Sequence, residues 1–157
     1  MEQIKELLEE HEQHPIDFSN VAMLRGGDAL EDEQNLLAMC LCSVSAAERA
    51  ASVLGVDSFM GERHQQVFEA IVEALGGDVC DGSMSTEVSE RMDAAGVLGG
   101  TGGIKYLIRL EETALPAAYA KQYIDRVKVK SDKRKAQQFL IRAYELSKRD
   151  GSNEQIL

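Results

Sequence analysis

The sequence is poor in cysteine and lacks long apolar runs. Its three cysteines, Cys40, Cys42 and Cys80, form an odd number without metal-ligand spacing, which argues against a disulfide framework and against a zinc site. We expect them to be buried thiols in a reducing compartment. No apolar run approaches the ~18 residues of a membrane span, and no charged segment leads into an apolar signal core. A soluble, cytoplasmic protein without membrane contact is therefore predicted.

Basic residues are scarce in the first three quarters of the chain. Residues 1–120 hold 7 Lys and Arg against 22 Asp and Glu, whereas residues 121–157 hold 10 against 5. The formal net charge of −10 argues against a molecule that coats a nucleic acid, because its average field repels phosphates. The 157 residues fit one domain with an acidic body and a basic end.

The phosphate-binding motifs of nucleotide enzymes are also missing. A P-loop needs a Gly-Lys dipeptide, which occurs nowhere in the chain, and a Rossmann loop needs a preceding strand. The five glycines between Gly96 and Gly103 instead suit two helix ends that meet in a tight corner, with Gly96 ending one helix and Thr101 capping the next. No cofactor is predicted. A small nucleotide-binding enzyme that uses GGTGG is an alternative of a different class, which ATP titration of a Gly102→Ala variant tests.

What is present is a close succession of helix patterns. Asp28 with Glu31 and Ser45 with Glu48 make capping-box-like starts, and Gly55 can close the second helix. A third helix ends at Gly76, and a fourth begins near Ser85. The expected inward faces are Leu30, Leu37, Leu41 and Val44 in the first helix, Val67, Phe68, Ile71, Val72 and Leu75 in the third, Val88, Met92 and Ala95 in the fourth, and Ile104, Leu107 and Ile108 in the next.

Beyond Pro116 the pattern becomes long and helical. β-Branched residues and a serine between Val127 and Ser131 weaken helix propensity, so a bend or a turn into a hairpin is expected there. The segment offers too few partners to bury its apolar stripes internally, which points to self-association. We predict an all-α fold, a compact bundle of short helices followed by a long C-terminal helical arm or hairpin. The expected self-association and partner surface is Tyr119, Tyr123, Ile124, Val127, Phe139, Leu140 and Tyr144.

Several spaced motifs in this chain resemble the N-terminal domain of DnaB-type replicative helicases. They are the EDEQNLL run from Glu31 to Leu37, the Gly96-x-Leu98 pair, and Tyr123 with Val127. The resemblance covers about residues 30–148. The residues that carry it as a structural motif are Glu33, Phe59, His64, Phe68, Gly102, Gly103, Tyr106 and Leu107.

The resemblance implies a domain without catalytic activity. In that family the domain packs in pairs, as a dimer or a trimer of dimers, to build a collar on the hexameric motor, and it offers a docking surface to primase and to helicase loaders. The expected partners are therefore a second copy, primase or a loader, and the helicase motor domain, whose nucleotide-binding motif this chain lacks.

The same reading divides the chain into four parts. Residues 1–27 match nothing in the family and are interpreted as an acidic N-terminal extension. The helical head is expected at residues 28–115, the hairpin or arm at 116–150, and the start of a linker toward a motor at 151–157. The chain departs from the family between the third and fourth helices, where GGDVCDGSMS replaces the usual Pro-x-Asp element. An alternative is a free-standing regulator, such as a phage protein, that imitates the domain and binds a helicase or primase. The reading frame after Leu157 distinguishes the two.

Individual polar residues favour structural roles. His64 lies on an apolar face without a Ser, Cys, Asp or second His at fixed spacing, so we interpret it as a packing and hydrogen-bonding histidine. Neighbouring residues on a helix point about 100° apart, which argues against a catalytic carboxylate pair among Glu31, Asp32 and Glu33. We interpret these acids as a favourable interaction with the positive N-terminus of the helix.

The basic segment, defined here as residues 121–135, has three interpretations. It can be a solvated face, it can dock on the acidic head of a neighbouring copy, or it can line a path for single-stranded DNA. Aromatic residues that would stack bases are few where the charge is highest, so a solvated or protein-docking role is favoured over direct DNA contact. Its basic residues are Lys121, Arg126, Lys128, Lys130, Lys133, Arg134 and Lys135.

Overall fold

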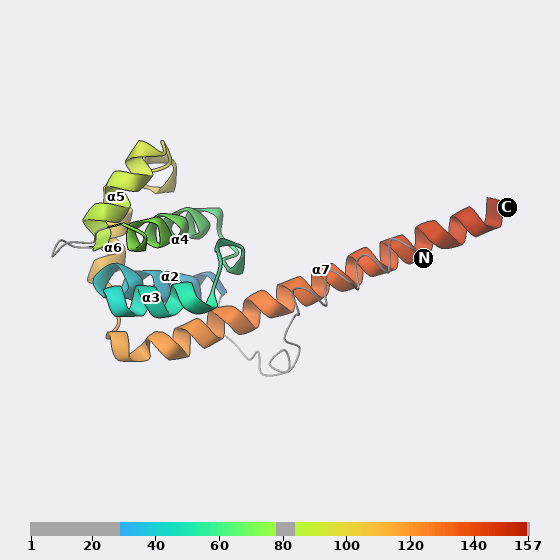
Figure 1. Cartoon of the computed structure of the whole chain (residues 1–157), viewed down its shortest axis with the longest axis horizontal. Helices are drawn as coiled ribbons and strands as arrows, with labels where there is room; N and C mark the ends of the chain where they lie inside the picture. Colours follow the sequence, from blue (N-terminus) through green and yellow to red (C-terminus); the bar gives the residue numbers. More distant parts are fainter. Residues whose placement is uncertain (1–28, 78–83, 157) are drawn as a thin grey trace. The chain divides into compact units, whose positions relative to one another are not determined.

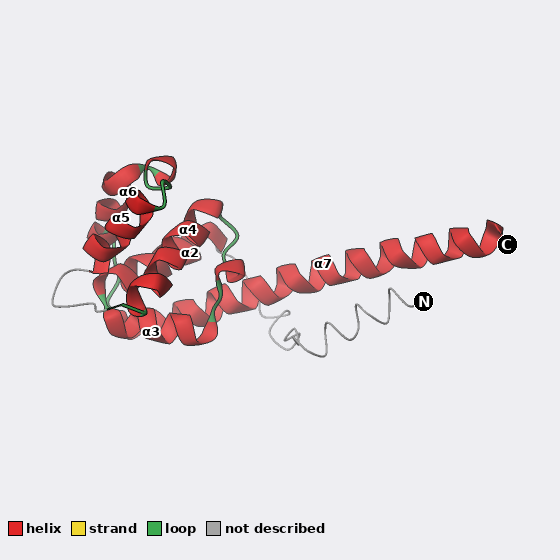
Figure 2. Cartoon of the chain, turned by 45° about the horizontal axis from the view of Figure 1, so that its top comes forward, coloured by secondary structure: helices red, strands yellow, loops and turns green. Residues whose placement is uncertain are grey.

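The computed structural model describes residues 29–156 apart from 78–83, and within those ranges every regular element is a helix (Figures 1 and 2). The predicted all-α class is confirmed. The acidic extension 1–27, the Asp28 cap, Cys80 and most of the divergent loop lie outside the described residues. The elements are α2 (Ala29–Cys42), α3 (Val44–Val53), η2 (Val56–Ser58), α4 (Glu62–Leu75), α5 (Met84–Ala94), η3 (Gly99–Thr101), α6 (Gly103–Glu112), η4 (Ala117–Tyr119) and α7 (Ala120–Ile156).

The chain forms two units, which are described separately. The head unit runs from Arg25 to Lys128, and the described part of the second unit is α7 from Val129 onward. None of the helices in the described ranges is long and apolar enough to cross a membrane.

Helix α2 is the centre of the head. It packs against α3, α4, α5 and α6, and six consecutive residues from Leu36 to Leu41 are buried, so it has no solvent-facing side over nearly two turns. The prediction of one apolar face was therefore partly wrong. Leu37 and Leu41 are buried, but Leu30 is exposed, and Val44 is the exposed first residue of α3 and does not belong to α2.

Helices α3, α4 and α5 begin and end at local signals. Ser43, not Ser45, caps α3, because the chain is extended at Ser43 and its side-chain oxygen accepts a hydrogen bond from Ala46 N at 3.2 Å. Helix α4 ends at Gly76 and α5 begins one residue before Ser85, as expected. The interior sides of α4 and α5 carry the predicted Val67, Phe68, Ile71, Val88 and Met92, whereas Val72 and Ala95 are exposed and Leu75 is half-buried.

The glycine-rich corner joins α5 to α6. Gly96 has a φ of 74°, and the amides of Val97 and Leu98 donate to Met92 O at 3.0 and 3.2 Å, which satisfies the end of α5. Gly102, with a φ of 103°, caps α6. Thr101 does not, because its buried hydroxyl donates back to Leu98 O at 2.8 Å. Two helix ends thus account for Gly96, Gly102 and Gly103, whereas a Cβ on Gly99 or Gly100 would meet no atom within 4 Å.

The expected inner side of α6 is only partly confirmed, because Leu107 is buried but Ile104 and Ile108 are not. Tyr106, Leu107 and Leu110 face the core, whereas Ile104 and Ile108 are exposed. Apolar residues occur on both sides of this helix, so periodicity alone does not identify the inner side.

Helix α7 is one continuous helix from Ala120 to Ile156. The expected bend or hairpin at Val127–Ser131 does not form, and six of the seven residues assigned to a linker start are helical. The first turns of α7 belong to the head, because Ala120, Ile124 and Val127 are members of its core. Burial of these side chains supplies the stabilisation that the local helix propensity lacks.

Candidate functional site

A buried carboxylate links α2 to the start of α4. Glu33 is 1 % exposed, and its Oε1 accepts hydrogen bonds from Met60 N at 2.7 Å and Gly61 N at 3.4 Å. Gly61 is the N-cap of α4 and has no side chain to cap the helix, so Glu33 supplies the negative charge at this positive helix end. A buried carboxylate without such donors is strongly unfavourable.

His64 connects this carboxylate to α6. Its Nδ1 lies 3.5 Å from Glu33 Oε1, and its Nε2 is hydrogen-bonded to Tyr106 Oη at 3.1 Å, with the donor set by the tautomer. Glu33, His64 and Tyr106 therefore form a polar network across α2, α4 and α6. The guanidinium of Arg63 covers the Tyr106 ring at 3.8 Å from its centroid.

The polar network has the residue types of a catalytic triad, a carboxylate, a histidine and a hydroxyl. Its environment argues for a structural role. His64 and Tyr106 are buried, and burial raises the pKa of the Tyr106 hydroxyl, an effect that Arg63 opposes. A raised pKa makes the phenolate nucleophile less available at neutral pH. The interpretation of His64 as a packing and hydrogen-bonding residue agrees with these contacts.

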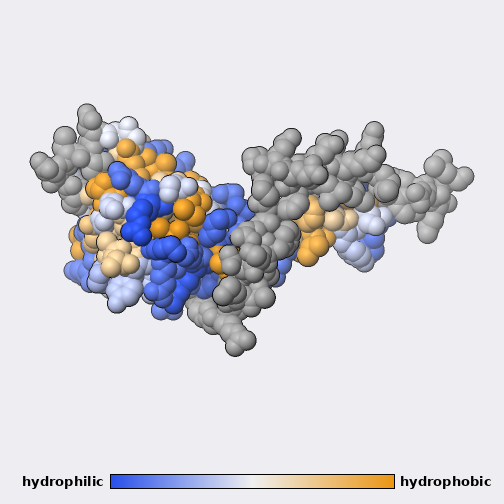
Figure 3. All heavy atoms as spheres, turned by 60° about the horizontal axis from the view of Figure 1, so that its bottom comes forward, coloured by the Kyte–Doolittle hydropathy of each residue, from blue (hydrophilic) through white to orange (hydrophobic). Residues whose placement is uncertain are grey.

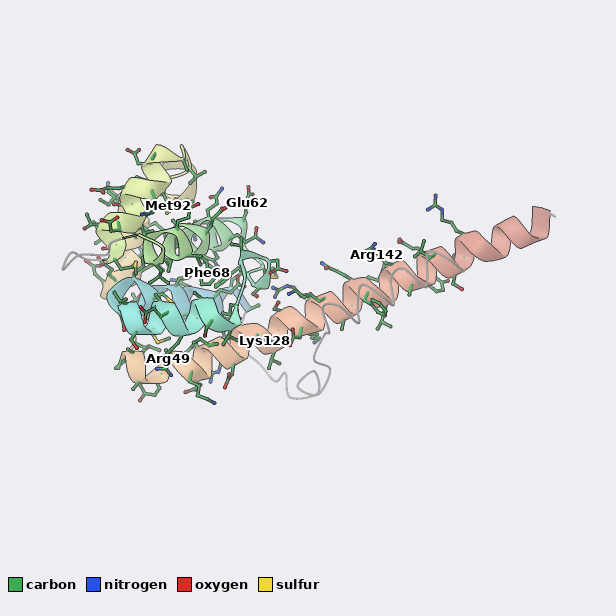
Figure 4. All side chains as sticks on the ribbon, viewed as in Figure 1. Arg49, Glu62, Phe68, Met92, Lys128 and Arg142 are labelled. Carbon is green, nitrogen blue, oxygen red and sulfur yellow. The ribbon has the colours of Figure 1, made fainter. Side chains whose placement is uncertain are left out.

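The remaining motif residues lie in the core of the head or at the glycine-rich corner. The rings of Phe59 and Phe68 stack with centroids 4.6 Å apart, and the Phe68 side chain points from α4 into the head (Figure 4). A Cβ on Gly102 would lie 3.2 Å from Tyr106 Cβ, so this corner approaches Tyr106 closely. Leu107 is buried in the core, and Gly103 continues the corner with a φ of 70°. Phe59, Phe68, Tyr106 and Leu107 thus belong to one hydrophobic core.

The first four residues of the predicted association surface behave differently from expectation. Ile124 and Val127 are buried in the core of their own head, so the expectation that this stripe lacks internal partners was wrong for them. Tyr123 packs partly against the same core, under the Arg126 guanidinium at 4.9 Å. Tyr119 remains half exposed.

The later part of α7 presents apolar side chains to solvent. Leu140, Ile141 and Tyr144 are 62 %, 57 % and 63 % exposed, and we call them the exposed stripe. They fall on one side of the helix, and Lys148 lies 5.3 Å from the Tyr144 ring. Figure 3 shows apolar colouring on the described surface of α7. Phe139 is only half-buried and lies on a different side. Ile141 was not among the predicted surface residues, although its position next to Leu140 indicates it.

The basic segment is partly engaged in ion pairs. Arg126 lies 3.5 Å from Asp32 of α2, and Lys121 lies 3.4 Å from Asp125 one turn later. Asp32 is buried, so the first pair is partly shielded from solvent, whereas the second is exposed and weak. Side chains of the segment such as Lys128 project from α7 in Figure 4.

The cysteines do not behave uniformly. Burial raises the pKa of Cys40 to about 12, which leaves it an unreactive core thiol. Cys42 is exposed, so the expectation that it is buried was wrong; its pKa is also raised, by partial burial and by Glu111. The described residues contain no group of three or more His, Cys, Asp or Glu that could hold a metal ion.

Short helices around a central helix, a buried polar network and a long terminal helix define an all-α scaffold domain. The chain belongs to the DnaB-like helicase N-terminal domain family, whose model matches residues 28–129. It is also similar to the solved N-terminal domain of DnaB helicase from Mycobacterium tuberculosis, with 25 % identity, a TM-score of 0.62, and coverage of 73 % of this chain and 92 % of that one. No curated protein matches.

Proposed function

We propose that this chain is a non-catalytic oligomerisation and partner-docking domain of a cytoplasmic replicative helicase, where it forms the N-terminal collar and recruits primase or a loader. The observation that carries the proposal is the exposed stripe on α7 in a chain of this family. Three neighbouring large apolar side chains, each more than half exposed, are an unfavourable surface for a monomer in water and a favourable one for an interface.

The exposed stripe is a better association surface than the earlier residues of α7. Ile124 and Val127 already contact their own core, so substitution there disturbs the head before it disturbs an interface. Tyr123→Asp would also disturb the head and is therefore a poor test of association, because Tyr123 packs partly on that core. Leu140 and Tyr144 lack this complication.

Sedimentation equilibrium of the full chain tests self-association. We expect concentration-dependent oligomers for the unchanged chain and a monomer for Leu140→Asp, because an unpaired charge is costly in an apolar contact. Arg142→Asp is the matched control, since Arg142 is exposed and lies about 100° or more around the helix from each residue of the exposed stripe, so its substitution should leave association intact. A strictly monomeric unchanged chain at high micromolar concentration would refute self-association.

Recruitment needs a separate measurement. Mixing the chain with a helicase motor domain, and separately with primase or a loader, should give complexes that co-elute in size-exclusion chromatography. A variant that removes self-association but keeps such a complex would place the partner surface elsewhere, for example on the exposed Ile104 and Ile108 of α6. Failure to bind any of these partners would contradict recruitment and leave oligomerisation as the function.

A further inference from the structure

Helix α6 has two exposed isoleucines on its solvent side. Tyr106, Leu107 and Leu110 face the core of the head, whereas Ile104 and Ile108 are 54 % and 45 % exposed. The two isoleucines are four residues apart, so they lie on the same side of the helix, one turn from each other. Two neighbouring large apolar side chains on an exposed helix side favour contact with another molecule.

Charged residues lie beside this apolar pair near both ends of the helix. Lys105 is in the first turn of α6 and Glu112 is its last residue, and both side chains are exposed. At ~100° per residue, Lys105 and Glu112 point within about 20° of each other and about 40–60° from Ile108, so they follow the same edge of the pair. We call Ile104, Lys105, Ile108 and Glu112 the α6 face.

Both charges oppose the dipole of their own helix. The N-terminus of a helix is its positive end and the C-terminus its negative end, so a lysine in the first turn and a glutamate in the last are each slightly unfavourable. Neither Lys105 nor Glu112 has an ion-pair partner within the part of the chain that the structure describes. A surface that presents the opposite order of charges would therefore complement the α6 face.

We propose that the α6 face binds the α6 face of a second copy, with the two helices antiparallel. A two-fold axis beside Ile108 brings the two copies of Ile108 together and places Lys105 of each copy near Glu112 of the other. Lys105 lies three residues before Ile108 and Glu112 four residues after it, so the paired charges differ by only ~1.5 Å along the helix. A parallel pair would instead bring like charges to the same level.

The α6 face is small, so the contact is weak. Four residues cover much less than the ~800 Å² per partner of a stable interface. We therefore expect free copies to separate at micromolar concentration, and we expect the contact to form where another surface already holds the copies at high local concentration. The inference does not depend on the exposed stripe, because the α6 face lies entirely within the head unit.

Disulfide trapping in the full chain tests this contact apart from the exposed stripe. Leu140→Asp removes association through the stripe. Cys42→Ser and Cys80→Ser leave the buried Cys40 as the only native thiol. Mild oxidation at several hundred micromolar chain then accumulates even a weak contact as a covalent dimer, because the disulfide holds each pair that meets in the correct geometry.

Two cysteine positions on α6 are compared in this background. Ile108→Cys places a thiol beside the two-fold axis, where the Cα atoms of closely packed helices are near enough for a disulfide. Arg109→Cys is the matched control, since Arg109 is also exposed but points ~100° further around the helix. We expect the disulfide between chains to form about tenfold faster at Ile108→Cys than at Arg109→Cys.

Charge reversal identifies the partner and its orientation. In the Ile108→Cys chain at low ionic strength, Lys105→Glu should slow the disulfide about fivefold, because each new carboxylate faces Glu112 of the other copy. Lys105→Glu/Glu112→Lys should restore the rate, since both pairs return with their signs exchanged. Lys105→Glu favours the dipole of α6, so slower trapping does not reflect unfolding of this helix.

The outcome is independent of the sedimentation experiment, because the exposed stripe is removed in every chain compared. Equal disulfide rates at Ile108→Cys and Arg109→Cys would overturn the proposal and leave the two isoleucines of α6 to a different partner. Failure of the double charge reversal to restore the rate would overturn it as well, because an antiparallel pair of identical faces requires that recovery.

Discussion

At the scale of single residues, Glu33 is the side chain that joins α2 to the start of α4. It is buried, accepts two backbone hydrogen bonds at the start of α4 and lies beside His64. Its contacts come from residues 27 to 31 positions later in the sequence. The spaced motif indicated that Glu33 and His64 matter, but only the fold brings them together.

We expect Glu33→Ala to lower the free energy of unfolding by about 2–4 kcal/mol, because it leaves the backbone N–H groups of Met60 and Gly61 without their acceptor. Glu33→Gln should cost less, since its amide oxygen can still accept from Met60 N. Urea unfolding followed by circular dichroism measures both. Glu62→Gln is the control, because Glu62 is an exposed acid in the first turn of the same α4. Equal stability of Glu33→Ala and the unchanged chain would contradict the role of Glu33.

Tyr106 gives a prediction about pH. Its pKa is raised in the folded chain, so folding favours the neutral hydroxyl. This contribution is complete below the unfolded pKa of about 10 and is lost as the pH rises through the higher folded value. At neutral pH, the free energy of unfolding of Tyr106→Phe should be lower by about 1–3 kcal/mol, because His64 Nε2 loses its hydrogen-bond partner. It should also lose less stability than the unchanged chain between pH 9 and 11. Parallel pH dependences of the two proteins would exclude this linkage.

At the scale of elements, the corner between α5 and α6 needs glycine at one position more than at its neighbours. Gly102 combines a φ of 103° with a close approach to Tyr106, whereas a Cβ on Gly100 would meet no atom within 4 Å. We expect Gly102→Ala to destabilise the head by about 1–2 kcal/mol and Gly100→Ala to have little effect. Thermal unfolding of the pair measures the difference. If both variants unfold alike, the backbone at Gly102 is not the constraint that we infer.

The elements also show how far the sequence alone could predict the fold. The inner side of α4 was largely predictable, because one side of that helix is buried and the other is charged. The inner sides of α2 and α6 were not, since α2 is buried nearly all round and α6 has apolar residues on both sides. The continuity of α7 was missed because packing of Ile124 and Val127 outweighs the local propensity for a bend.

At the scale of the whole molecule, charge is divided between an acidic body and a basic end. Two modes of self-association are therefore possible in principle. The exposed stripe of one copy can meet that of another, or the basic segment of one copy can dock on the acidic head of the next. The two modes respond differently to salt, because ions screen charge pairs, whereas they strengthen the burial of apolar groups or leave it unchanged.

We expect self-association to follow the apolar mode. Its dissociation constant, measured by sedimentation in 0.1 M and 1 M NaCl, should change by no more than about threefold, whereas docking through several charge pairs would weaken far more. Leu140→Asp should abolish association at both salt concentrations, and Lys133→Gln/Lys135→Gln should leave it nearly unchanged. A steep loss of association in 1 M NaCl together with a strong effect of the lysine substitutions would assign the interface to the basic segment, because only charge pairs depend on both.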